Sequence, residues 1–339
     1  MVGSLDRVGQ NLWRCPILEQ EQMYRLCENY IREDVCNWAV PADEPHALCQ
    51  ACRFTQVVPD LSQPRNKEAW YKLEVAKRRL LYSLLRLGCP VRNRVEDPER
   101  GLGFEFLAIT EGPGARPLLT GHADGVITIN VAEADDAESE RRRQQLHEPY
   151  RTLLGHFRHE VGHYYWDRLM KEKVGIDAFR ECFGDERKDY SRALQAHYQQ
   201  GPPGGWQQRF VSPYASSHPW EDWAETCAHY LHMTDTLEMA AASGLSLHPE
   251  TLDELMPRSA VRGKGASESL DQLIESWFPL TCVLNNLNRG LGLPDGYPFV
   301  LSLAAIEKLR LVHLTIGVTS HIVLVQNADA ILAKDNVSM

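Results

Sequence analysis

The segment "GHFRHEVGHYYWDRL", residues 155–169, places a glutamate between two histidines. His159 and His163 are four residues apart, so on a helix both imidazoles leave the same face, one turn apart. Two such nitrogens can bind one zinc ion at about 2.0–2.1 Å. Glu160 is the next residue around the helix and can address a water beside the metal without binding the metal itself. This His-Glu-x-x-His spacing is typical of zinc peptidases and predicts hydrolytic chemistry.

An alternative interpretation of this pentamer is two surface histidines near a helical carboxylate. The flanking residues favour a buried helix instead. Val161 and Gly162 are small, and a small residue beside the second histidine lets another segment of the chain approach closely. The aromatic run Tyr164, Tyr165 and Trp166 predicts that the helix packs against a core.

A catalytic zinc site has three protein ligands and an open position, so a third ligand is required. The segment "SPYASSHPWEDWAETCAHYLHM" supplies candidates. Glu221, Glu225 and His229 recur every four residues and share one face of a helix that follows Pro219. Either Glu221 or Glu225 is then the ligand, and the other is a partner of a ligating histidine. The competing interpretation is a solvated helix face, which the neighbouring tryptophans disfavour.

A second potential metal site lies among the cysteines near the N-terminus. Cys49 and Cys52 form a C-x-x-C pair, a turn that can offer two thiolates to one zinc ion. Cys27 and Cys36 would complete a tetrahedral four-thiolate site, the closed arrangement of structural zinc. Their spacing is wider than a second C-x-x-C pair, so buried thiols remain the alternative.

Composition and charge limit the kinds of partner. The chain has 339 residues, is 43% hydrophobic and carries a formal net charge of −10, so it can bury a large core but is not expected to bind nucleic acid. No apolar stretch suits a signal peptide or reaches the roughly 18 residues of a membrane-spanning helix. We therefore expect a cytoplasmic protein with no membrane contact. In such a reducing compartment nine cysteines are better metal ligands than disulfide partners.

The pattern of residues predicts a mixture of helices and strands. The segment 57–66, "VVPDLSQPRN", indicates a boundary, and a long helix with Asn66 as N-cap should follow it and end before Gly88. Five apolar residues keep helical spacing within it: Trp70, Leu73, Leu80, Leu81 and Leu84. The basic run 77–79 falls in the same helix, where we interpret it as a solvated face rather than a phosphate site.

Alternating, β-branched segments at 103–110 and 125–135 predict two neighbouring strands. Helical patterns follow at about 150–173, at about 220–239 and after residue 267, and the glycines and prolines of 199–208 predict a loop.

The segments "RHEVGHYYWD" and "HPWEDWAETCAHYLH" resemble a family of zinc-dependent metallopeptidases with an N-terminal zinc-binding region. The similarity extends to "CNWAV", "LCQACR", "PDLS", "AKRRLLYSLLRLGCP", "GHADGVITINVAEAD" and "NNLNRGLGLPDGYPFV", and so covers nearly all of residues 24–313. Family members often carry a further C-x-x-C pair upstream. This chain has only Cys15 there, so that first ribbon is missing or degenerate.

The resemblance implies an α+β fold of the glutamate-zincin type. It gives a cysteine-rich zinc-binding module at 1–60, a zincin-like metallopeptidase domain at 61–325 and a tail at 326–339. The Glu-x-x-x-Glu order, with Tyr214 seven residues before Glu221, is also similar to the zinc site of anthrax lethal factor-type peptidases. That similarity implies Glu221 as ligand, Glu225 as partner of a ligating histidine and Tyr214 as oxyanion donor. It rests on local spacing, because the separation from His163 to Glu221 is longer than in thermolysin. Tyr214 as a core aromatic stays open.

The expected function is therefore peptide hydrolysis with two zinc ions, one catalytic and one structural. Glu160 takes a proton from the attacking water and returns it to the leaving amine. A peptide or protein substrate could lie extended along the strand at Val126–Val131, taken as a sheet edge. The alternative function is a non-catalytic, zinc-stabilised protein-binding module.

The remaining polar residues near these motifs receive weaker interpretations. Asp167, one turn after His163, could orient a ligand imidazole. The other histidines have no partner in the sequence pattern and are interpreted as surface groups or neighbours of a ligand: His156, His218, His232 and His313.

Overall fold

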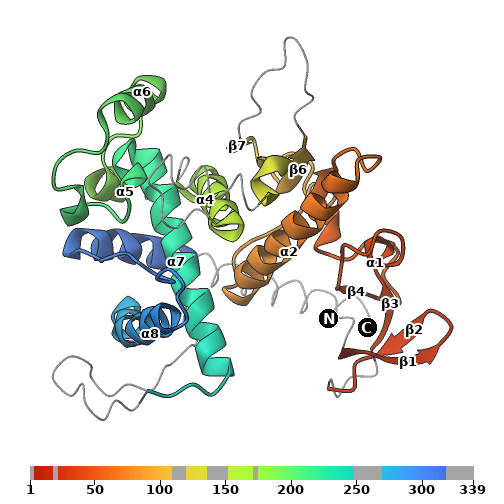
Figure 1. The fold of residues 1–339 in the computed structure, drawn as a ribbon. Helices are drawn as coiled ribbons and strands as arrows, with labels where there is room; N and C mark the ends of the chain where they lie inside the picture. Colours follow the sequence, from red (N-terminus) through yellow and green to blue (C-terminus); the bar gives the residue numbers. More distant parts are fainter. Residues whose placement is uncertain are drawn as a thin grey trace, which may run out of the picture. The chain divides into compact units, whose positions relative to one another are not determined.

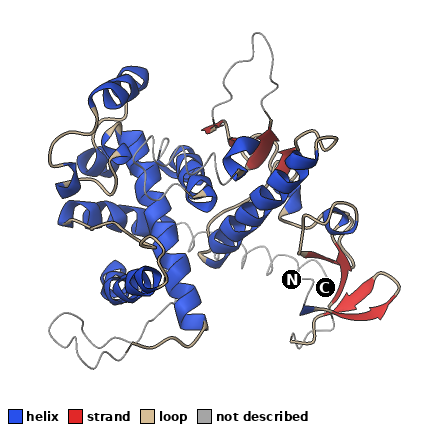
Figure 2. Cartoon of the chain, viewed as in Figure 1, coloured by secondary structure: helices blue, strands red, loops and turns tan. Residues whose placement is uncertain are grey.

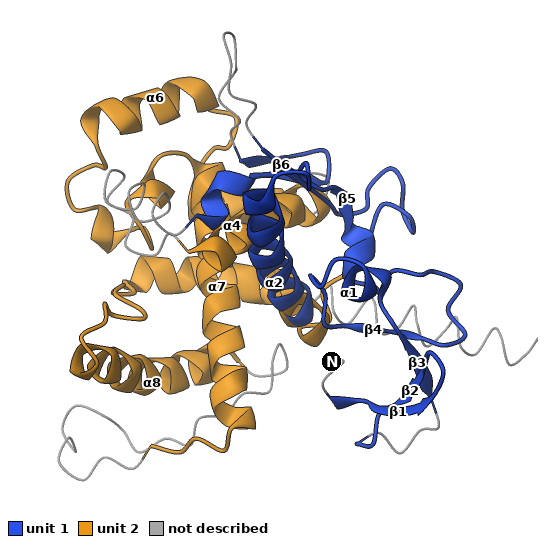
Figure 3. Ribbon diagram, turned by 45° about the vertical axis from the view of Figure 1, so that its right-hand side comes forward, with its two compact units in different colours: residues 1–82, 91–142 blue, residues 83–90, 143–339 orange. Residues whose placement is uncertain are grey.

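The computed structural model describes residues 4–17, 22–108, 120–135, 152–170, 175–247 and 269–317. The described chain is a mixture of helices and strands (Figures 1 and 2). It divides into two compact units, one formed by residues 1–82 and 91–142 and the other by residues 83–90 and 143–339 (Figure 3). Every described strand belongs to the first unit. The expected tail at 326–339 lies outside the described residues.

The N-terminal part of the first unit is a small antiparallel sheet in the order β1-β2-β3-β4. Its strands are β1 (Asp6–Gly9), β2 (Leu12–Arg14), β3 (Met23–Leu26) and β4 (Ala39–Pro41). The short helix α1 (Glu28–Ile31) and the 3-10 turn η2 (Cys52–Phe54) carry or adjoin cysteines of the predicted tetrad. Such a short sheet with little apolar core needs an additional source of stability, and a bound metal ion can provide it.

The long helix α2 (Pro64–Arg86) begins two residues before the predicted N-cap Asn66, so that prediction is wrong. Proline suits the first turn of a helix because its missing N–H would have no partner there. The Asn66 amide donates instead to the Asp60 carbonyl at 2.9 Å. The predicted end is confirmed, since Gly88 has a positive φ of 68° just past the helix. The five apolar residues with helical spacing are all buried, as predicted.

The basic run on α2 is not a solvated face. Lys77 and Arg78 are 0% and 5% exposed, and their cationic groups lie 2.8 and 3.6 Å from the Glu74 carboxylate. Glu74 is also buried and accepts from the Thr55 hydroxyl at 2.7 Å. Arg78 donates to the Val35 carbonyl at 2.7 Å, next to Cys36. Buried charges need partners, and an i, i+3 and i, i+4 carboxylate supplies them. Arg78 thus holds the cysteine-bearing loop against α2.

A second sheet has the order β5-β6-β8-β7, with β5 (Thr55–Val57), β6 (Gly103–Leu107) and β8 (Val126–Asn130) parallel and β7 (Gly121–Ala123) antiparallel. The two predicted neighbouring strands are confirmed, because β6 pairs with β8 from Gly103 opposite Val126 to Leu107 opposite Asn130. The prediction that the β8 segment forms a sheet edge is wrong. β7 pairs with it over Val126–Thr128, so β8 has strands on both sides.

The second unit is helical within the residues described. It contains α4 (Leu153–Tyr165), which continues as the π-turn η4 (Trp166–Met170), then α5 (Ile176–Phe183), α6 (Tyr190–Gln200), α7 (Pro219–Ala242) and α8 (Leu270–Gly290). A further helix covers 303–317. Short 3-10 turns occur at η5 (Trp206–Gln208) and η6 (Tyr214–Ser216). The predicted loop 199–208 is shorter than expected, because α6 runs to Gln200 and η5 begins at Trp206. The sequence patterns had not indicated α5 or α6.

The helices that carry the predicted ligands have well-formed starts. The Thr152 hydroxyl accepts from the Gly155 amide at 3.0 Å and so caps α4. His218 caps α7, with its Nδ1 accepting from the Trp220 amide at 3.1 Å, and Pro219 occupies the first turn. These two helices lie side by side because Gly162 leaves room for α7. The close approach predicted from the small residue beside His163 is therefore confirmed.

No helix among the described residues combines the length and the apolar character needed to cross a membrane.

Candidate metal centre and active site

Three donor atoms from two helices converge in the second unit. His159 Nε2 and His163 Nε2, on α4, lie 3.1 Å apart. Glu221 Oε2, on the first turn of α7, is 3.0 Å from His159 Nε2 and 3.4 Å from His163 Nε2. Ligands at about 2.0–2.1 Å from one tetrahedral ion are about 3.3 Å apart, so the triangle has the dimensions of a zinc site. All three side chains are buried, where such a cluster of donors is expected to hold a cation.

Glu225 lies on the outer side of His159. Its Oε1 accepts from His159 Nδ1 at 2.7 Å, and its Oε2 accepts from the Ser212 hydroxyl at 2.6 Å. A proton held on Nδ1 leaves the Nε2 lone pair of His159 free for a metal. Burial would raise the pKa of Glu225, but the hydrogen bond and charge of His159 outweigh it and lower the pKa below its ordinary value. Glu225 is therefore an anion that orients His159.

His163 is positioned differently from His159. Its ring packs on the Trp220 indole at a centroid distance of 4.2 Å. Its Nδ1 has no hydrogen-bond partner among the described residues. The interpretation of Asp167 as the group that orients a ligand imidazole is therefore wrong for His163. On its Nδ1 side this ring is held by packing against Trp220 and not by a carboxylate.

Glu160 is 4% exposed, and its Oε1 lies 3.3 Å from His156 Nε2. Burial would raise its pKa, but the His156 hydrogen bond and the charges of His159 and His156 outweigh it and lower the pKa. The carboxylate is thus ionised and able to accept a proton. The contact with His156 was missed from the sequence, although the i, i+4 spacing was the available signal.

Tyr190, at the start of α6, is a second group that the sequence did not indicate. Its hydroxyl donates to Glu221 Oε1 at 2.5 Å. Burial and the Glu221 charge raise the pKa of Tyr190, so the phenol keeps its proton and remains a donor. The Glu221 carboxylate therefore has one oxygen on Tyr190 and the other on the two histidines. No periodic pattern in the sequence connects residue 190 to residue 221.

Tyr214 lies beside the cluster on η6. Its ring centroid is 5.9 Å from that of His159, and the side chain is half-buried. Burial and the Glu221 charge raise its pKa, so it too stays protonated. The His197 ring of α6 contacts it at 5.9 Å.

Four other described histidines of the second unit have structural partners. His218 Nε2 donates to the Lys188 carbonyl at 3.1 Å in addition to capping α7. His229 Nδ1 lies 2.7 Å from the Tyr297 hydroxyl, and His313 Nδ1 lies 3.0 Å from the Tyr230 hydroxyl. The His232 ring packs edge-on against Trp277 at 5.6 Å. These rings join α7 to its neighbouring segments.

The first unit holds the four predicted cysteines together. Cys27, Cys36, Cys49 and Cys52 are buried, and their sulfur atoms all lie within 4.8 Å of one another. Cys36 Sγ and Cys49 Sγ are 3.6 Å apart, close to the ~3.8 Å expected for thiolates at about 2.3 Å from one tetrahedral zinc ion. The amides of Cys49 and Trp38 donate to Cys27 Sγ and Cys36 Sγ, each at 3.3 Å. Amide donors stabilise thiolates, so this donor set suits a structural zinc ion.

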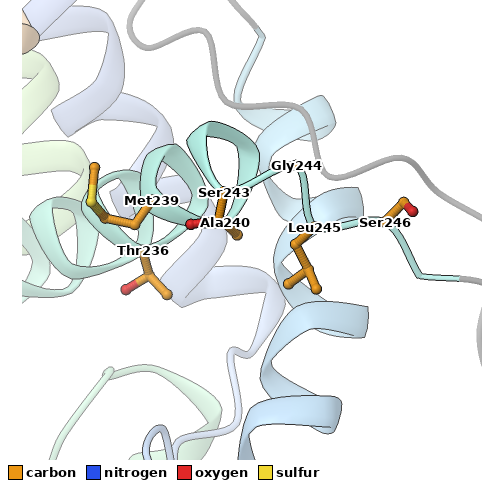
Figure 4. Close-up of a pocket in the computed structure, with 7 residues that line it drawn as sticks. All are labelled: Thr236, Met239, Ala240, Ser243, Gly244, Leu245 and Ser246. Atoms are coloured by element: carbon orange, nitrogen blue, oxygen red, sulfur yellow. The ribbon is translucent and has the colours of Figure 1, made fainter.

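A shallow hollow at the end of α7 is chemically different from both clusters (Figure 4). Its lining carries no histidine, cysteine or carboxylate: Thr236, Met239, Ala240, Ser243, Gly244, Leu245 and Ser246. We assign no chemistry to it.

Comparison with known proteins agrees with the two metal clusters. Residues 66–315 match the family described as "Putative zinc-binding metallo-peptidase", and residues 1–63 match a zinc-ribbon domain. Uncharacterised proteins of Mycobacterium tuberculosis and Mycobacterium bovis are 43% identical over 298 residues, which is 88% of this chain and 84% of theirs. No solved structure matches. With most of its length matched by the family model, and with a zinc-ribbon domain at its N-terminus, the chain belongs to this zinc-binding metallo-peptidase family.

Proposed function

We propose that this protein is a zinc-dependent peptidase with its active site on α4 and α7. His159, His163 and Glu221 would hold the catalytic zinc ion, Glu160 would be the general base and Glu225 would orient His159. The observation that carries the proposal is the triangle of His159 Nε2, His163 Nε2 and Glu221 Oε2, with sides of 3.0, 3.1 and 3.4 Å. The family assignment supports a peptidase in general.

Zinc supplies Lewis acidity that makes a water nucleophilic near neutral pH and polarises a carbonyl. Glu160, ionised and adjacent to the cluster, takes the proton of the attacking water and then returns it to the amine that leaves. The Tyr214 hydroxyl, which stays protonated, donates to the oxyanion of the tetrahedral intermediate. Glu225 keeps the proton of His159 on Nδ1 throughout the reaction.

The two clusters also suggest a division of the chain into domains and a place for the protein in the cell. We propose a zincin-like domain at 61–325 for the catalytic site and a module at 1–60 in which Cys27, Cys36, Cys49 and Cys52 bind a structural zinc ion. Four metal-binding thiolates require reduced sulfur, which supports a place in the cytoplasm. The substrate class is a peptide or protein chain.

Hydrolysis of a mixed peptide library by the purified full-length protein tests this function. We expect cleavage that a zinc chelator abolishes and added zinc restores, with product ends identified by mass spectrometry. Two bound zinc ions without chelator-sensitive cleavage would contradict the peptidase assignment. That result would favour the alternative function, a zinc-stabilised protein-binding module.

A further inference from the structure

The two carboxylate oxygens of Glu221 have different neighbours, and Tyr190 of α6 is responsible for the difference. Its Oε2 faces the two histidines at 3.0 and 3.4 Å, whereas its Oε1 accepts from the Tyr190 hydroxyl at 2.5 Å. Glu221 is 1% exposed, so both carboxylate oxygens lie away from bulk solvent. A hydroxyl that donates to a carboxylate makes a stronger hydrogen bond than one between two neutral groups. Tyr190 therefore selects which oxygen remains for the histidines.

The Tyr190 ring is itself held by two residues that precede Glu221 in the sequence. It packs edge-on against His218 at 5.2 Å and Trp220 at 5.7 Å. His218 also donates to the Lys188 carbonyl, two residues before Tyr190. The start of α6 is thus attached to the first turn of α7 through rings and a hydrogen bond. Asp189 caps α6 by accepting from the Arg192 amide at 3.0 Å, which fixes the backbone at this point.

The same aromatic group reaches the other ligand helix. The Trp220 ring contacts the His163 ring at a tilt of 51° and a centroid distance of 4.2 Å, so Tyr190, Trp220 and His163 form a continuous series of ring contacts. A loose carboxylate on the first turn of a helix could rotate, bind a metal through both oxygens or turn away from it. The hydroxyl and the packed ring remove that freedom.

We propose that Tyr190 is a positioning residue for the metal centre: its hydroxyl holds Glu221 so that Oε2 alone is presented beside His159 and His163. This inference rests on the proposed function, because it takes Glu221 as the metal ligand. Tyr190 lies on α6, which carries none of the predicted ligands. A separate helix would thus hold the third ligand in position. Groups of this kind usually change metal affinity by about 10- to 100-fold.

Zinc affinity of the full-length protein, measured by titration against a chromophoric chelator, tests the inference without relying on activity. Tyr190→Phe removes only the hydroxyl and should weaken the more readily stripped zinc by about 10- to 100-fold. Tyr190→4-aminophenylalanine restores a donor and should bind zinc nearly as the wild type does. Tyr71→Phe is the control: it removes the hydroxyl of a half-exposed tyrosine on α2 and should leave both zinc affinities unchanged. Should Tyr190→Phe unfold, Tyr190→4-methylphenylalanine fills the ring position without a donor and carries the same expectation.

A double-mutant cycle with Glu221→Gln shows whether Tyr190 acts through Glu221. In that background, titrated up to zinc concentrations that fill the weakened site, Tyr190→Phe should cause no further loss of zinc affinity. Wild-type zinc binding by Tyr190→Phe, or an equal loss in both backgrounds, would overturn the inference and leave the proposed function standing. A wild-type protein that binds only the cysteine-held zinc would overturn the proposed function and this inference with it.

Discussion

The two candidate histidine ligands differ in how their second nitrogen is satisfied. His159 Nδ1 donates to the Glu225 carboxylate, whereas His163 Nδ1 has no partner among the described residues and its ring packs on Trp220. A carboxylate partner makes an imidazole a more basic ligand and fixes its tautomer. A metal ion held by the histidines would therefore be near Glu221 and one imidazole away from Glu225, although both glutamates occupy one face of α7.

Zinc affinities measured on variants of Glu221 and Glu225 should distinguish the roles of the two residues. Glu221→Gln should leave the catalytic site largely empty at micromolar zinc, because an amide oxygen is a much weaker ligand than a carboxylate. Glu225→Gln should still bind zinc, about 10- to 100-fold more weakly, because only the partner of His159 changes. Chelator competition on both variants measures the difference. If the Glu225→Gln variant holds less zinc than the Glu221→Gln variant, the two roles must be exchanged.

Glu160 is expected to act in catalysis and not in metal binding. Glu160→Gln should keep the catalytic zinc and lower the rate of peptide hydrolysis by about 10²- to 10⁴-fold, because the amide keeps the shape of the side chain and loses its basicity. Turnover on a cleaved library peptide, with zinc content measured on the same sample, checks both parts. Glu68→Gln on α2, a side chain 75% exposed, is the matched control. Unchanged turnover in Glu160→Gln would leave the proposed mechanism without its base.

At the scale of elements, the site depends on how closely α4 and α7 approach. A Cβ added at Gly162 would lie 2.9 Å from the Ala224 Cα and 3.1 Å from the Cys227 Cβ. The Trp223 indole donates to the Gly162 carbonyl at 3.0 Å across the same interface. Glycine at this position therefore sets the separation of the helices, and with it the distance between Glu221 and the histidines.

Gly162→Val should weaken both the fold and the metal site. The added side chain meets backbone atoms of α7 and forces the helices apart, which typically costs about 1–3 kcal/mol. We expect a lower midpoint in denaturant unfolding and a lower affinity for the catalytic zinc. Gly204→Val is the control, because a Cβ there meets nothing within 4 Å. Equal stability of the two variants would contradict the role given to Gly162.

At the scale of the whole molecule, the two metal clusters belong to different compact units. The cysteine tetrad offers four donor atoms, enough to close a tetrahedral site, whereas the histidine cluster offers three, so a zinc ion there would keep one coordination position open. A closed thiolate site releases zinc more slowly than an open one, so the two ions should be distinguishable.

We therefore expect about two zinc ions per chain, one of them readily stripped by chelator. Combined His159→Ala and His163→Ala should reduce elemental zinc to about one, and combined Cys49→Ser and Cys52→Ser should remove the other. Cys282→Ser, at an exposed thiol outside the tetrad, should keep both. Two zinc ions in the histidine double variant would show that the second metal binds elsewhere.

Local periodicity made much of the scaffold predictable. Residue type and short spacing were enough to predict four features: the helical histidine motif, the candidate carboxylates on a second helix, the cysteine tetrad, and the neighbouring strands β6 and β8. The sequence patterns misplaced the first residue of α2 by three residues, treated Lys77 and Arg78 as solvated, and took β8 for a sheet edge. In each case a contact that the periodicity does not reveal decides the outcome. The Asn66 side chain donates to the Asp60 carbonyl, Lys77 and Arg78 pair with the buried Glu74, and β7 pairs with β8.

The sequence by itself determined which donor atoms are available and which share a helix face, since helix geometry is fixed by spacing alone. Helical spacing left Glu221 and Glu225 equivalent, because residues four apart point the same way, and only the resemblance to lethal factor-type zinc sites favoured Glu221. Only the packing of α7 against α4 through Gly162 placed Glu221 Oε2 at the two Nε2 atoms and Glu225 at His159 Nδ1. The contacts of Tyr190 with Glu221 and of Trp220 with His163 likewise arise in the tertiary structure. Such contacts depend on helix positions in space, which no local pattern encodes.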